Sequence, residues 1–354
     1  MRRAAITGWG RCTPDPVLTN DDLASVMDTS DEWITTRSGI KERRVSPAEN
    51  SDMATVAASH ALAAAGLEAE DIDYIMVATC TGDRQIPATA CRVQDKLGAT
   101  NAAALDVNAG CTGFIYGLNL ANGLIAAGSA ERVLLIGSER ITPFLDLEER
   151  STAVLFGDGA GAAVIEAARG EEGLVSINVG SDGTIADVLT CQGVGSSYIG
   201  EPPVPVRVVM DGTALFRAAV LGMSAAAEKA ITDAGWTGDD VDLVFPHQAN
   251  IRIIDATVRR LDVDDAKVYT NIASYGNTSA ASIPLALSEA LDVGRVEPGA
   301  KLILVGFGAG LTWGAAGIVW GDRVEPITTS DAALPPTDKT GLEIIMERQA
   351  LRSA

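Results

Sequence analysis

Short runs of apolar residues alternate along the chain with longer stretches that have the apolar period of a helix. The runs at 103–107 (AALDV) and 241–245 (VDLVF) have strand length, and residues 114–127 repeat apolar side chains at helical spacing. Nearly continuous apolar strands that alternate with helices are typical of sheets covered by helices on both faces. The pattern therefore predicts an α/β protein.

This pattern occurs twice, at an offset of 169 residues. Three gapless matches carry the repeat: Ala65-Gly66 with Ala234-Gly235, Asp71–Asp73 with Asp240–Asp242, and Arg132–Gly137 with Lys301–Gly306. Two duplicated halves, 1–170 and 171–321, predict five α-β-α-β-α layers with mixed, mostly parallel sheets. Chance similarity between two apolar α/β stretches is the alternative.

Three separated residues supply a nucleophile and two hydrogen-bonding partners, a set typical of covalent acyl chemistry. Cys111 lies between a predicted strand and helix, where the helix dipole favours a thiolate. His247 follows a predicted strand, at the end where open sheets bind ligands. The offset places Asn108 on Asn277, so the turns that hold Cys111 and Asn277 are equivalent points of the two halves. We expect these turns to face each other.

Each of these residues also has a structural interpretation. Cys111 would otherwise be a buried core thiol, although Gly110 and Gly113 beside it pack poorly in a core. The other histidine, His60, lies in an alanine-rich amphipathic stretch, and we assign it no chemistry. Five cysteines, an odd number without close spacing, fit neither a disulfide framework nor a zinc site. We therefore expect no metal.

The glycine-rich segment 157–161 (GDGAG) does not predict a nucleotide site. It lacks the order of strand, GxGxxG and helix, and no P-loop lysine follows it. Close packing of two backbones is the better interpretation. Gly306 has a functional interpretation. Its N–H, at the end of a predicted strand, is expected to join the N–H of Cys111 in an oxyanion hole.

Six motifs lie in order along the chain: Asp28–Ile34, Thr36–Arg43, the segment around Cys111, Phe156–Gly161, Pro246–Arg252 and Gly276–Ser282. Together, over about residues 3 to 321, they resemble the β-ketoacyl-acyl carrier protein synthase III family of the thiolase superfamily. The resemblance implies a thiolase-like five-layer fold and an initiating condensing enzyme of fatty acid synthesis, an acyltransferase.

The chemistry that the resemblance implies has two halves. Cys111 would take an acyl group from acyl-CoA, with the N–H groups of Cys111 and Gly306 holding the oxyanion. His247 and Asn277 would then bind the thioester carbonyl of malonyl-acyl carrier protein while CO2 departs. The products would be 3-oxoacyl-acyl carrier protein, CoA and CO2, and no cofactor is needed.

The resemblance also implies three groups of binding residues. The CoA contacts would be Trp33, Arg37, Arg150 and Arg252. The acyl pocket would contain Ile86, Phe156 and Leu189, with Ile86 in place of an aromatic residue that reaches across a homodimer. The docking patch for the acyl carrier protein would be Arg217, Arg252, Arg259 and Arg260. Without the resemblance, Trp33 would be interpreted as a core or interface aromatic and the arginines as solvated surface charges.

Charge and composition limit the partners. At a net charge of −20 the chain is expected to repel nucleic acid and anionic membranes, and clustered arginines would be needed to attract an acidic carrier protein. With 354 residues, 47% of them hydrophobic, it can bury a large core. The start lacks the apolar stretch of a signal peptide, and no apolar run of about 18 residues is present. We expect a cytoplasmic enzyme.

Residues 322–354 continue beyond the region of resemblance as an extension of unknown role. Pro335-Pro336 is followed by the stretch Leu342–Leu351, which predicts a disordered linker that ends in a short amphipathic helix.

Several other functions use a similar set of residues. Within the fold, the alternatives are a starter ketosynthase, a long-chain acyl-condensing enzyme and an acyltransferase of secondary metabolism. A non-catalytic acyl-CoA-binding protein is the alternative from another class. Hydroxymethylglutaryl-CoA synthases and thiolases fit less well, because the first require a catalytic glutamate and the second a cysteine where Asn277 stands.

Overall fold

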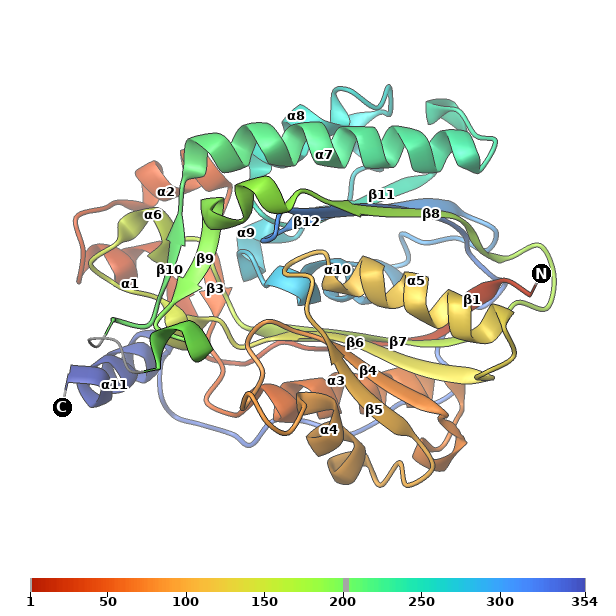
Figure 1. Ribbon diagram of the computed structural model, residues 1–354, viewed down its shortest axis with the longest axis horizontal. Coiled ribbons are helices and arrows are strands. Elements are labelled where there is room, and N and C mark those ends of the chain that lie inside the picture. Colours follow the sequence, from red (N-terminus) through yellow and green to blue (C-terminus); the bar gives the residue numbers. More distant parts are fainter. Residues whose placement is uncertain (1, 200–203, 354) are drawn as a thin grey trace.

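Two β-sheets form the body of the protein, one above the other (Figure 1). The computed structural model describes residues 2–199 and 204–353. The first sheet has the order β1 (Ala4–Cys12), β7 (Gly159–Ala167), β6 (Arg132–Glu139), β4 (Tyr74–Ala78), β5 (Ala103–Val107). The second has the order β11 (Leu243–Pro246), β12 (Lys301–Gly308), β13 (Thr312–Val319), β8 (Gly173–Ser181). Each sheet therefore draws its strands from one half of the chain.

Helices fill three layers around the two sheets (Figure 1). Between the sheets lie α5 (Gly113–Ala126) and α10 (Ser282–Asp292), and α3 (Asn50–Ala65) and α4 (Thr89–Leu97) cover the first sheet. The second sheet is covered by α7 (Gly212–Asp233) and α8 (Ile251–Val258). This arrangement confirms the five predicted layers. None of the helices in the described part of the chain has the length and apolar character needed to cross a membrane.

The two halves repeat the same topology. The pairs β1 and β8, β6 and β12, and α5 and α10 each begin 169 residues apart, as their bounds show. The strand order β1-β7-β6-β4 corresponds to β8-β13-β12-β11. Edge strand β5 has no strand counterpart, because the offset places the short helix α9 (Ile272–Tyr275) there. The duplication predicted from the sequence is confirmed.

Strand pairing is mixed in both sheets. The ladders β4–β5, β4–β6 and β11–β12 are parallel, whereas β1–β7, β6–β7, β12–β13 and β8–β13 are antiparallel. The antiparallel share is larger than the sequence indicates, because the glycine-rich strands β7 and β13 each run back between two other strands of their sheet. The parallel strands are the ones that lead into the candidate site.

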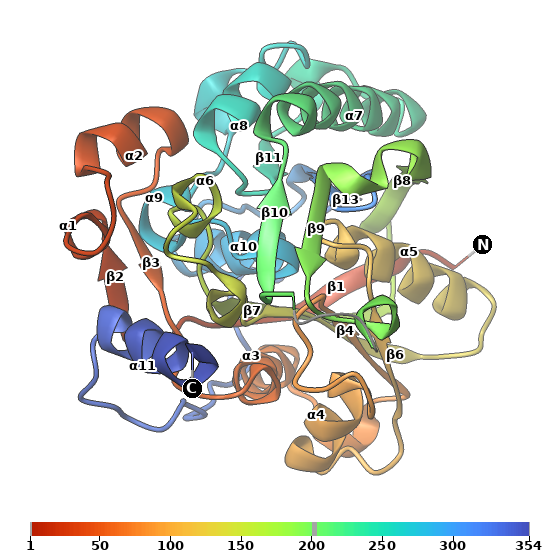
Figure 2. The same cartoon turned by 60° about the vertical axis from the view of Figure 1, so that its left-hand side comes forward.

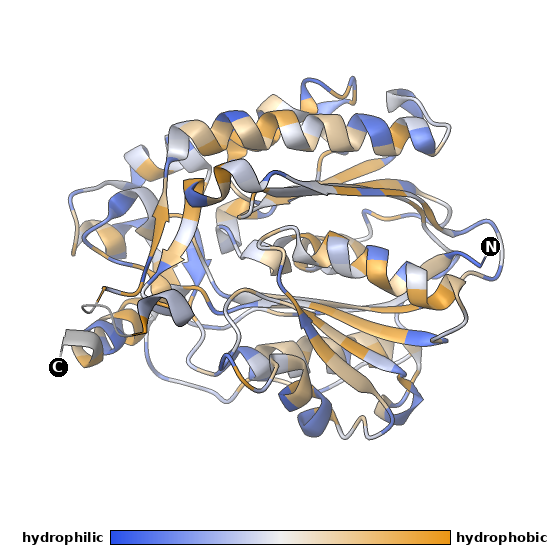
Figure 3. Cartoon of the chain, viewed as in Figure 1, coloured by the Kyte–Doolittle hydropathy of each residue, from blue (hydrophilic) through white to orange (hydrophobic). Residues whose placement is uncertain are grey.

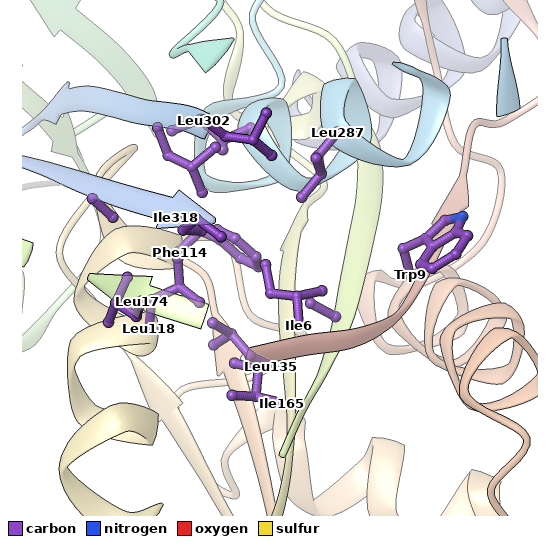
Figure 4. Close-up of a cluster of buried hydrophobic side chains, with 14 of the residues drawn as sticks. Ile6, Trp9, Phe114, Leu118, Leu135, Ile165, Leu174, Leu287, Leu302 and Ile318 are labelled. Carbon is purple, nitrogen blue, oxygen red and sulfur yellow. The ribbon is translucent and has the colours of Figure 1, made fainter. Parts of the chain in front are cut away.

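The main hydrophobic core lies between the sheets, around the two central helices. Figure 4 shows Phe114 of α5 among side chains of both sheets, including Leu135, Ile165 and Leu302. These residues are at most 1% exposed. Full burial of such a side chain contributes about 1.5–3 kcal/mol. Because the central helices touch a sheet on each side, they are apolar around most of their surface (Figure 3).

Glycines let α10 approach the first sheet closely. A Cβ atom on Gly161 would lie 2.4 Å from the backbone N of Leu285, and one on Gly137 would lie 2.2 Å from the carbonyl O of Ala280. No side chain fits at these distances. The interpretation of the GDGAG segment as a backbone contact is therefore confirmed.

Smaller elements gather at one end of the two sheets, beside the site (Figure 2). They are β2 (Val17–Thr19), α1 (Asn20–Ala24), α2 (Asp31–Ser38), β3 (Glu42–Arg44), α6 (Arg150–Ala153), β9 (Leu189–Gln192), β10 (Arg207–Met210) and α9. The last helix, α11 (Gly341–Ser353), also lies at this end.

The C-terminal extension packs against the body, which corrects the expectation of a disordered linker. The backbone N–H groups of Ile327 and Thr328 donate to carbonyls at the end of α3, and Arg323 Nη1 lies 3.0 Å from the carbonyl O of Thr7. Ile344 and Ile345 of α11 are 4% and 2% exposed within a cluster formed with β2 and α2. These two apolar anchors and the backbone hydrogen bonds explain the ordered path.

Candidate active site

The three predicted residues converge on one cavity. Cys111, His247 and Asn277 all line a cavity of about 260 Å³ at the end of the sheets. Cys111 follows β5, His247 follows β11, and Asn277 follows α9, the element that corresponds to β5 in the second half. A larger cavity of about 460 Å³ lies between β1 and the C-terminal extension, and it contains none of the three.

Cys111 lies two residues before α5 and is 8% exposed. Burial raises the pKa of its thiol to about 12, a hydrogen bond with Ser279 lowers it, and the charge of Glu139 raises it. Desolvation thus acts against the thiolate that the helix dipole is expected to favour.

His247 is 1% exposed, and burial lowers its pKa from 6.5 to about 3. Nδ1 lies 2.7 Å from Ser282 Oγ, and Nε2 is buried with no hydrogen-bond partner among the described residues. Ser282 Oγ accepts the backbone N–H of Gln248 at 3.4 Å, so its own proton is available for Nδ1. We assign the proton of the neutral ring to Nε2 from this network. The ring thus presents an N–H donor.

Asn277 is fixed with its amide group as the free donor. Its Oδ1 accepts the backbone N–H of Ser279 at 2.8 Å. Its backbone is held on both sides, by donation to Leu155 O at 2.9 Å and by acceptance from Gly157 N at 3.0 Å. With Oδ1 occupied, Nδ2 is the polar group of Asn277 left for a ligand. Two neutral donors, from His247 and Asn277, thus line the same cavity as Cys111.

The structure does not bring Gly306 to the cavity. Strand β12 continues two residues past the apolar run, and Gly306 pairs with Gly314 inside the β12–β13 ladder. A Cβ atom on Gly308 would lie 2.5 Å from Cys111 N, and the N of Ala309 lies 2.8 Å from the Cβ position of Gly110. Within the described chain the Ala309 N–H donates to no acceptor. Ala309 therefore replaces Gly306 as the candidate second donor.

Trp33, Arg37 and Arg150 form one cluster at the mouth of the cavity. The guanidinium carbon of Arg37 lies 4.6 Å from the centre of the Trp33 ring, and that of Arg150 lies 4.8 Å from it. Arg150 also donates to Asp28 O at 2.7 Å. Trp33, Arg37 and Arg252 line the cavity, and Arg150 joins them through the indole ring. Arg150 also lies 3.7 Å from Asp28 Oδ2, whereas Arg37 forms no ion pair with another described residue. An aromatic face with cations beside it suits a nucleotide.

The structure places two of the three predicted acyl-pocket residues in the cavity and the third outside it. Phe156 and Leu189 line the cavity together with Phe307, whose ring packs edge-on against His247 at 5.6 Å. Ile86 does not line it, and 84% of its surface is exposed. Within this single chain Ile86 therefore contacts no acyl group.

The four predicted docking arginines lie on the two helices over the second sheet. Arg217 belongs to α7, and Arg252 lies in the first turn of α8. Helix α8 ends at Val258, so Arg259 is its C-cap and Arg260 follows it. All four are exposed, and none forms an ion pair with another described residue. Arg252 alone of these arginines lines the cavity.

Sequence reasoning missed two functional neighbours of Cys111. Glu139 ends β6 and is fully buried, and the Ser279 hydroxyl donates to its carboxylate at 2.9 Å. Ser282, the partner of His247, was missed as well, although both serines stand in the quoted Gly276–Ser282 motif. A signal for Glu139 is present too, since an acidic residue comes directly after the buried run Val133–Ser138.

Comparisons with known proteins agree with this geometry. Residues 105–183 match the model of 3-oxoacyl-[acyl-carrier-protein] synthase III, and residues 231–320 match the model of its C-terminal part. β-Ketoacyl-[acyl-carrier-protein] synthase III 2 of Vibrio cholerae is 46% identical over 97% of this chain and 95% of its own length. The chain belongs to the β-ketoacyl-acyl carrier protein synthase III family. Membership makes it a condensing enzyme of the acyltransferase type.

Solved structures of the synthase III family have the same fold. The synthase of Aquifex aeolicus superposes with a TM-score of 0.85, at 42% identity over 90% of this chain and 100% of its own. The priming β-ketosynthase of the R1128 polyketide pathway has a TM-score of 0.86 at 36% identity, over 91% of this chain and 97% of its own. Because the Vibrio cholerae match covers 97% of the chain, it includes most of the C-terminal extension.

Proposed function

We propose that this synthase III family member condenses an acyl-CoA primer with malonyl-acyl carrier protein through an acyl-Cys111 intermediate. The products are 3-oxoacyl-acyl carrier protein, CoA and CO2. One observation carries the proposal: the His247 Nε2–H has no partner in residues 2–199 and 204–353 and belongs to the same cavity as Cys111 and Asn277. A buried donor without a partner is costly unless a ligand completes it.

Acylation uses the sulfur and two backbone donors. Cys111 Sγ attacks the thioester carbonyl, and the N–H groups of Cys111 and Ala309 stabilise the oxyanion. The bond to the CoA sulfur then breaks, which leaves the acyl group on Cys111. Loss of one such donor typically costs about 10²–10³ in rate.

Condensation uses the two side-chain donors. His247 Nε2–H and Asn277 Nδ2–H bond the thioester carbonyl of the malonyl group, where negative charge develops as CO2 leaves. Neutral donors held in a buried site stabilise this charge more in the transition state than in the ground state. The resulting carbanion attacks the acyl group on Cys111.

The surface around the cavity provides binding sites for both substrates. We assign Trp33, Arg37 and Arg150 to the adenine and phosphates of CoA, where Arg150 must leave the indole face for adenine to stack. We assign Arg217, Arg252, Arg259 and Arg260 to the acidic carrier protein, because they form no ion pair within the described part of a chain whose net charge is −20. Arg252 belongs to both groups, since it lines the cavity mouth.

A homodimer completes the acyl pocket in this proposal. Strand β5 is the outer strand of the first sheet, and four of its five residues are only partly buried while the first is exposed. Natural proteins rarely leave such an edge uncovered. A second copy on β5 would cover it and bring Ile86 of each copy to the cavity of the other. The five free cysteines fit the reducing cytoplasm.

Intact-mass analysis tests the proposal directly. The protein is offered a panel of acyl-CoAs, and we expect a mass gain on Cys111 that is absent in Cys111→Ala. Subsequent malonyl-acyl carrier protein should discharge it, with release of CO2. No mass gain with any acyl-CoA would favour an acyl-CoA-binding protein instead.

A starter ketosynthase of secondary metabolism is the second candidate. The likeness to the R1128 priming ketosynthase, at 36% identity, favours it. The same experiment separates the two, because a secondary-metabolism enzyme would discharge its acyl group preferentially to the carrier protein of that pathway. Discharge only by an alcohol or amine would indicate an acyltransferase.

A further inference from the structure

The C-terminal helix α11 packs one face against the body, at the same end of the sheets as the site (Figure 2). Gly341, Ile344 and Ile345 are buried and Arg348 is half-buried, and the four recur at helical spacing. A Cβ atom on Gly341 would lie 2.6 Å from the carbonyl O of Val17, so the start of the helix comes directly against β2. The proposed mechanism gives this helix no role.

Arg348 reaches from α11 into a buried polar network. Its Nη1 donates to Thr142 Oγ1 at 3.2 Å, and its Nη2 donates to the carbonyl O of Ser46. At the centre lies Asp158, which is fully buried. Its carboxylate accepts the N–H of Ser46 at 2.8 Å and the N–H and hydroxyl of Thr142 at 2.9 and 2.7 Å. The helix is therefore joined to three distant parts of the chain.

Arg348 brings positive charge to this buried carboxylate. In residues 2–199 and 204–353 no cation lies within ion-pair distance of Asp158. The Thr142 hydroxyl accepts from Arg348, so its own proton points to Asp158 and links the two charges. Burial raises the pKa of Asp158, whereas hydrogen bonds from Thr142 and Ser46 and the charge of Arg348 lower it. A buried carboxylate needs such partners.

The network closes a loop that forms one wall of the candidate site. Thr142 begins the short helix η2 (Thr142–Phe144), and Asp158 directly precedes β7, so their hydrogen bonds join the two ends of the loop 142–158. This loop contains α6 with Arg150 at the cavity mouth. Four of its residues line the cavity: Ser151, Val154, Leu155 and Phe156.

The second part of the loop is also held from the other side. Asn277 donates its backbone N–H to Leu155 O and accepts from Gly157 N, and Val154 O accepts from Arg43. These contacts fix residues 154–157 to the body without α11. Loss of a contact to α11 should therefore move this part of the loop little.

The first part of the loop, residues 142–153, depends more on α11. Leu147 and Ala153 belong to one apolar cluster with Ile344 and Ile345. Another tie is the ion pair of Asp146 with Arg207 at 3.5 Å, but both side chains are partly exposed, and such pairs contribute little. The helix thus holds this part through Arg348 at its base and through apolar contacts along its side.

We propose that α11 is part of the acyl-CoA site, because Arg348 and the apolar face of the helix hold residues 142–153 so that Arg150 stays beside Trp33 at the cavity mouth. This inference rests on the proposed function. Arg348 touches no substrate and acts through Thr142, so it is a positioning residue. The C-terminal extension then serves binding of the primer, and the donors His247 and Asn277 work without it.

Replacing Arg348 with Met keeps the apolar stem and removes the charge and the donors. We expect KM for acyl-CoA to rise about tenfold, because a displaced Arg150 no longer meets the phosphates. The single-turnover rate of acylation at saturating acyl-CoA should stay within about twofold of the wild type. Lys339→Met is the matched control. It removes a cation just before the same helix, paired with Glu347 at 2.6 Å on the exposed side, and should leave KM unchanged.

Two further measurements separate positioning from a general loss of structure. The acyl thioester of N-acetylcysteamine lacks the nucleotide, so its KM should be the same in Arg348→Met and in the wild type. Arg150→Met should raise KM for acyl-CoA by itself, and adding Arg348→Met to it should raise KM by less than about twofold more. Such a non-additive result is expected because both changes remove the same contact to CoA.

Thr142→Val gives an independent route into the same network. It replaces the hydroxyl between Arg348 and Asp158 by a methyl group and leaves the helix itself unchanged. We expect the same selective rise in KM for acyl-CoA. Arg348→Lys retains a positive charge at this position and should recover part of the loss. These two variants keep the inference testable if Arg348→Met does not fold.

The outcomes are distinct. Folded Arg348→Met and Thr142→Val proteins whose KM for acyl-CoA lies within about twofold of the wild type overturn the inference, as do equal rises in KM with both thioesters or additive effects with Arg150→Met. Each of these results leaves the condensing activity intact. A wild-type protein that takes up no acyl group from any acyl-CoA overturns the proposed function and this inference together.

Discussion

His247 Nδ1 lies 2.7 Å from the hydroxyl oxygen of Ser282, while Nε2 on the other side of the ring has no partner in the described structure. Ser282 is the first residue of α10, and His247 follows β11, so the contact joins a central helix to the end of a strand in the same half. It fixes the orientation of the ring and the nitrogen that carries its proton. His247 can therefore act as a donor without changing charge.

The pH dependence of decarboxylation should reflect this neutral ring. Burial lowers the pKa of His247 from 6.5 to about 3, so the ring stays neutral from pH 5 to 8 and would become charged only as the pH falls toward 3. We expect CO2 release by pre-acylated protein to show no inflection near pH 6.5. A stopped-flow CO2 assay across pH 5–8 measures this, and a rate that halves near pH 6.5 would contradict it.

Replacing Trp33 with Ala should weaken binding of the nucleotide part of CoA alone. A stacked base typically contributes about 1–3 kcal/mol, so we expect KM for acyl-CoA to rise about tenfold or more. The control is the acyl thioester of N-acetylcysteamine, which lacks adenine and phosphates and should retain its KM. Equal losses with both thioesters would show that Trp33 supports the fold instead.

Replacing Arg252 with Ala should affect the carrier protein more than the primer. Loss of one unpaired cation at the docking surface should raise KM for malonyl-acyl carrier protein by about tenfold at low salt, and less at high salt. Loading from acyl-CoA should change less. Arg169→Ala, in the exposed turn between β7 and β8, is the matched control, and an equal effect on both half-reactions would refute the assignment.

Replacing Ile86 with Phe should narrow the range of primers. If the side chain reaches the cavity of a second copy, a larger ring there should reduce loading of long or branched acyl-CoAs relative to acetyl-CoA by about tenfold or more. Ile199→Phe, at an equally exposed isoleucine, should leave the ratio unchanged. Competition experiments with mixed acyl-CoAs measure it, and light scattering should give a dimer mass. Unchanged selectivity would exclude Ile86 from the pocket.

The C-terminal helix should contribute to stability through its buried face. Ile345 is 2% exposed, and truncation to Ala should lower the free energy of unfolding by about 2–4 kcal/mol. Met346 beside it is 43% exposed, and the same truncation there should cost less than about 1 kcal/mol. Urea denaturation of both variants tests this difference. Equal, small changes in the free energy of unfolding would mean that α11 does not pack against the body of the protein in solution.

Much of the architecture follows from the sequence because its determinants are local or periodic. The apolar runs predict β5, β6 and β12, and the repeat predicts that two halves stack with Cys111 and Asn277 at corresponding turns. The glycine-rich segment 157–161 predicts close backbone contact. Polar residues directly after strands predict the site, since parallel strands end at one edge of a sheet.

Other properties depend on atoms brought together from distant segments. The sequence by itself determined which residues carry the chemistry: Cys111, His247 and Asn277. Only the tertiary structure decided the state of each group, because desolvation and hydrogen bonding depend on the complete surroundings of an atom. Burial lowered the pKa of His247 so that its ring is a neutral donor, and it raised the pKa of Cys111. Two extra residues of β12 placed Ala309 rather than Gly306 beside the turn that holds Cys111, and Ser279 met Glu139 across 140 positions of the chain.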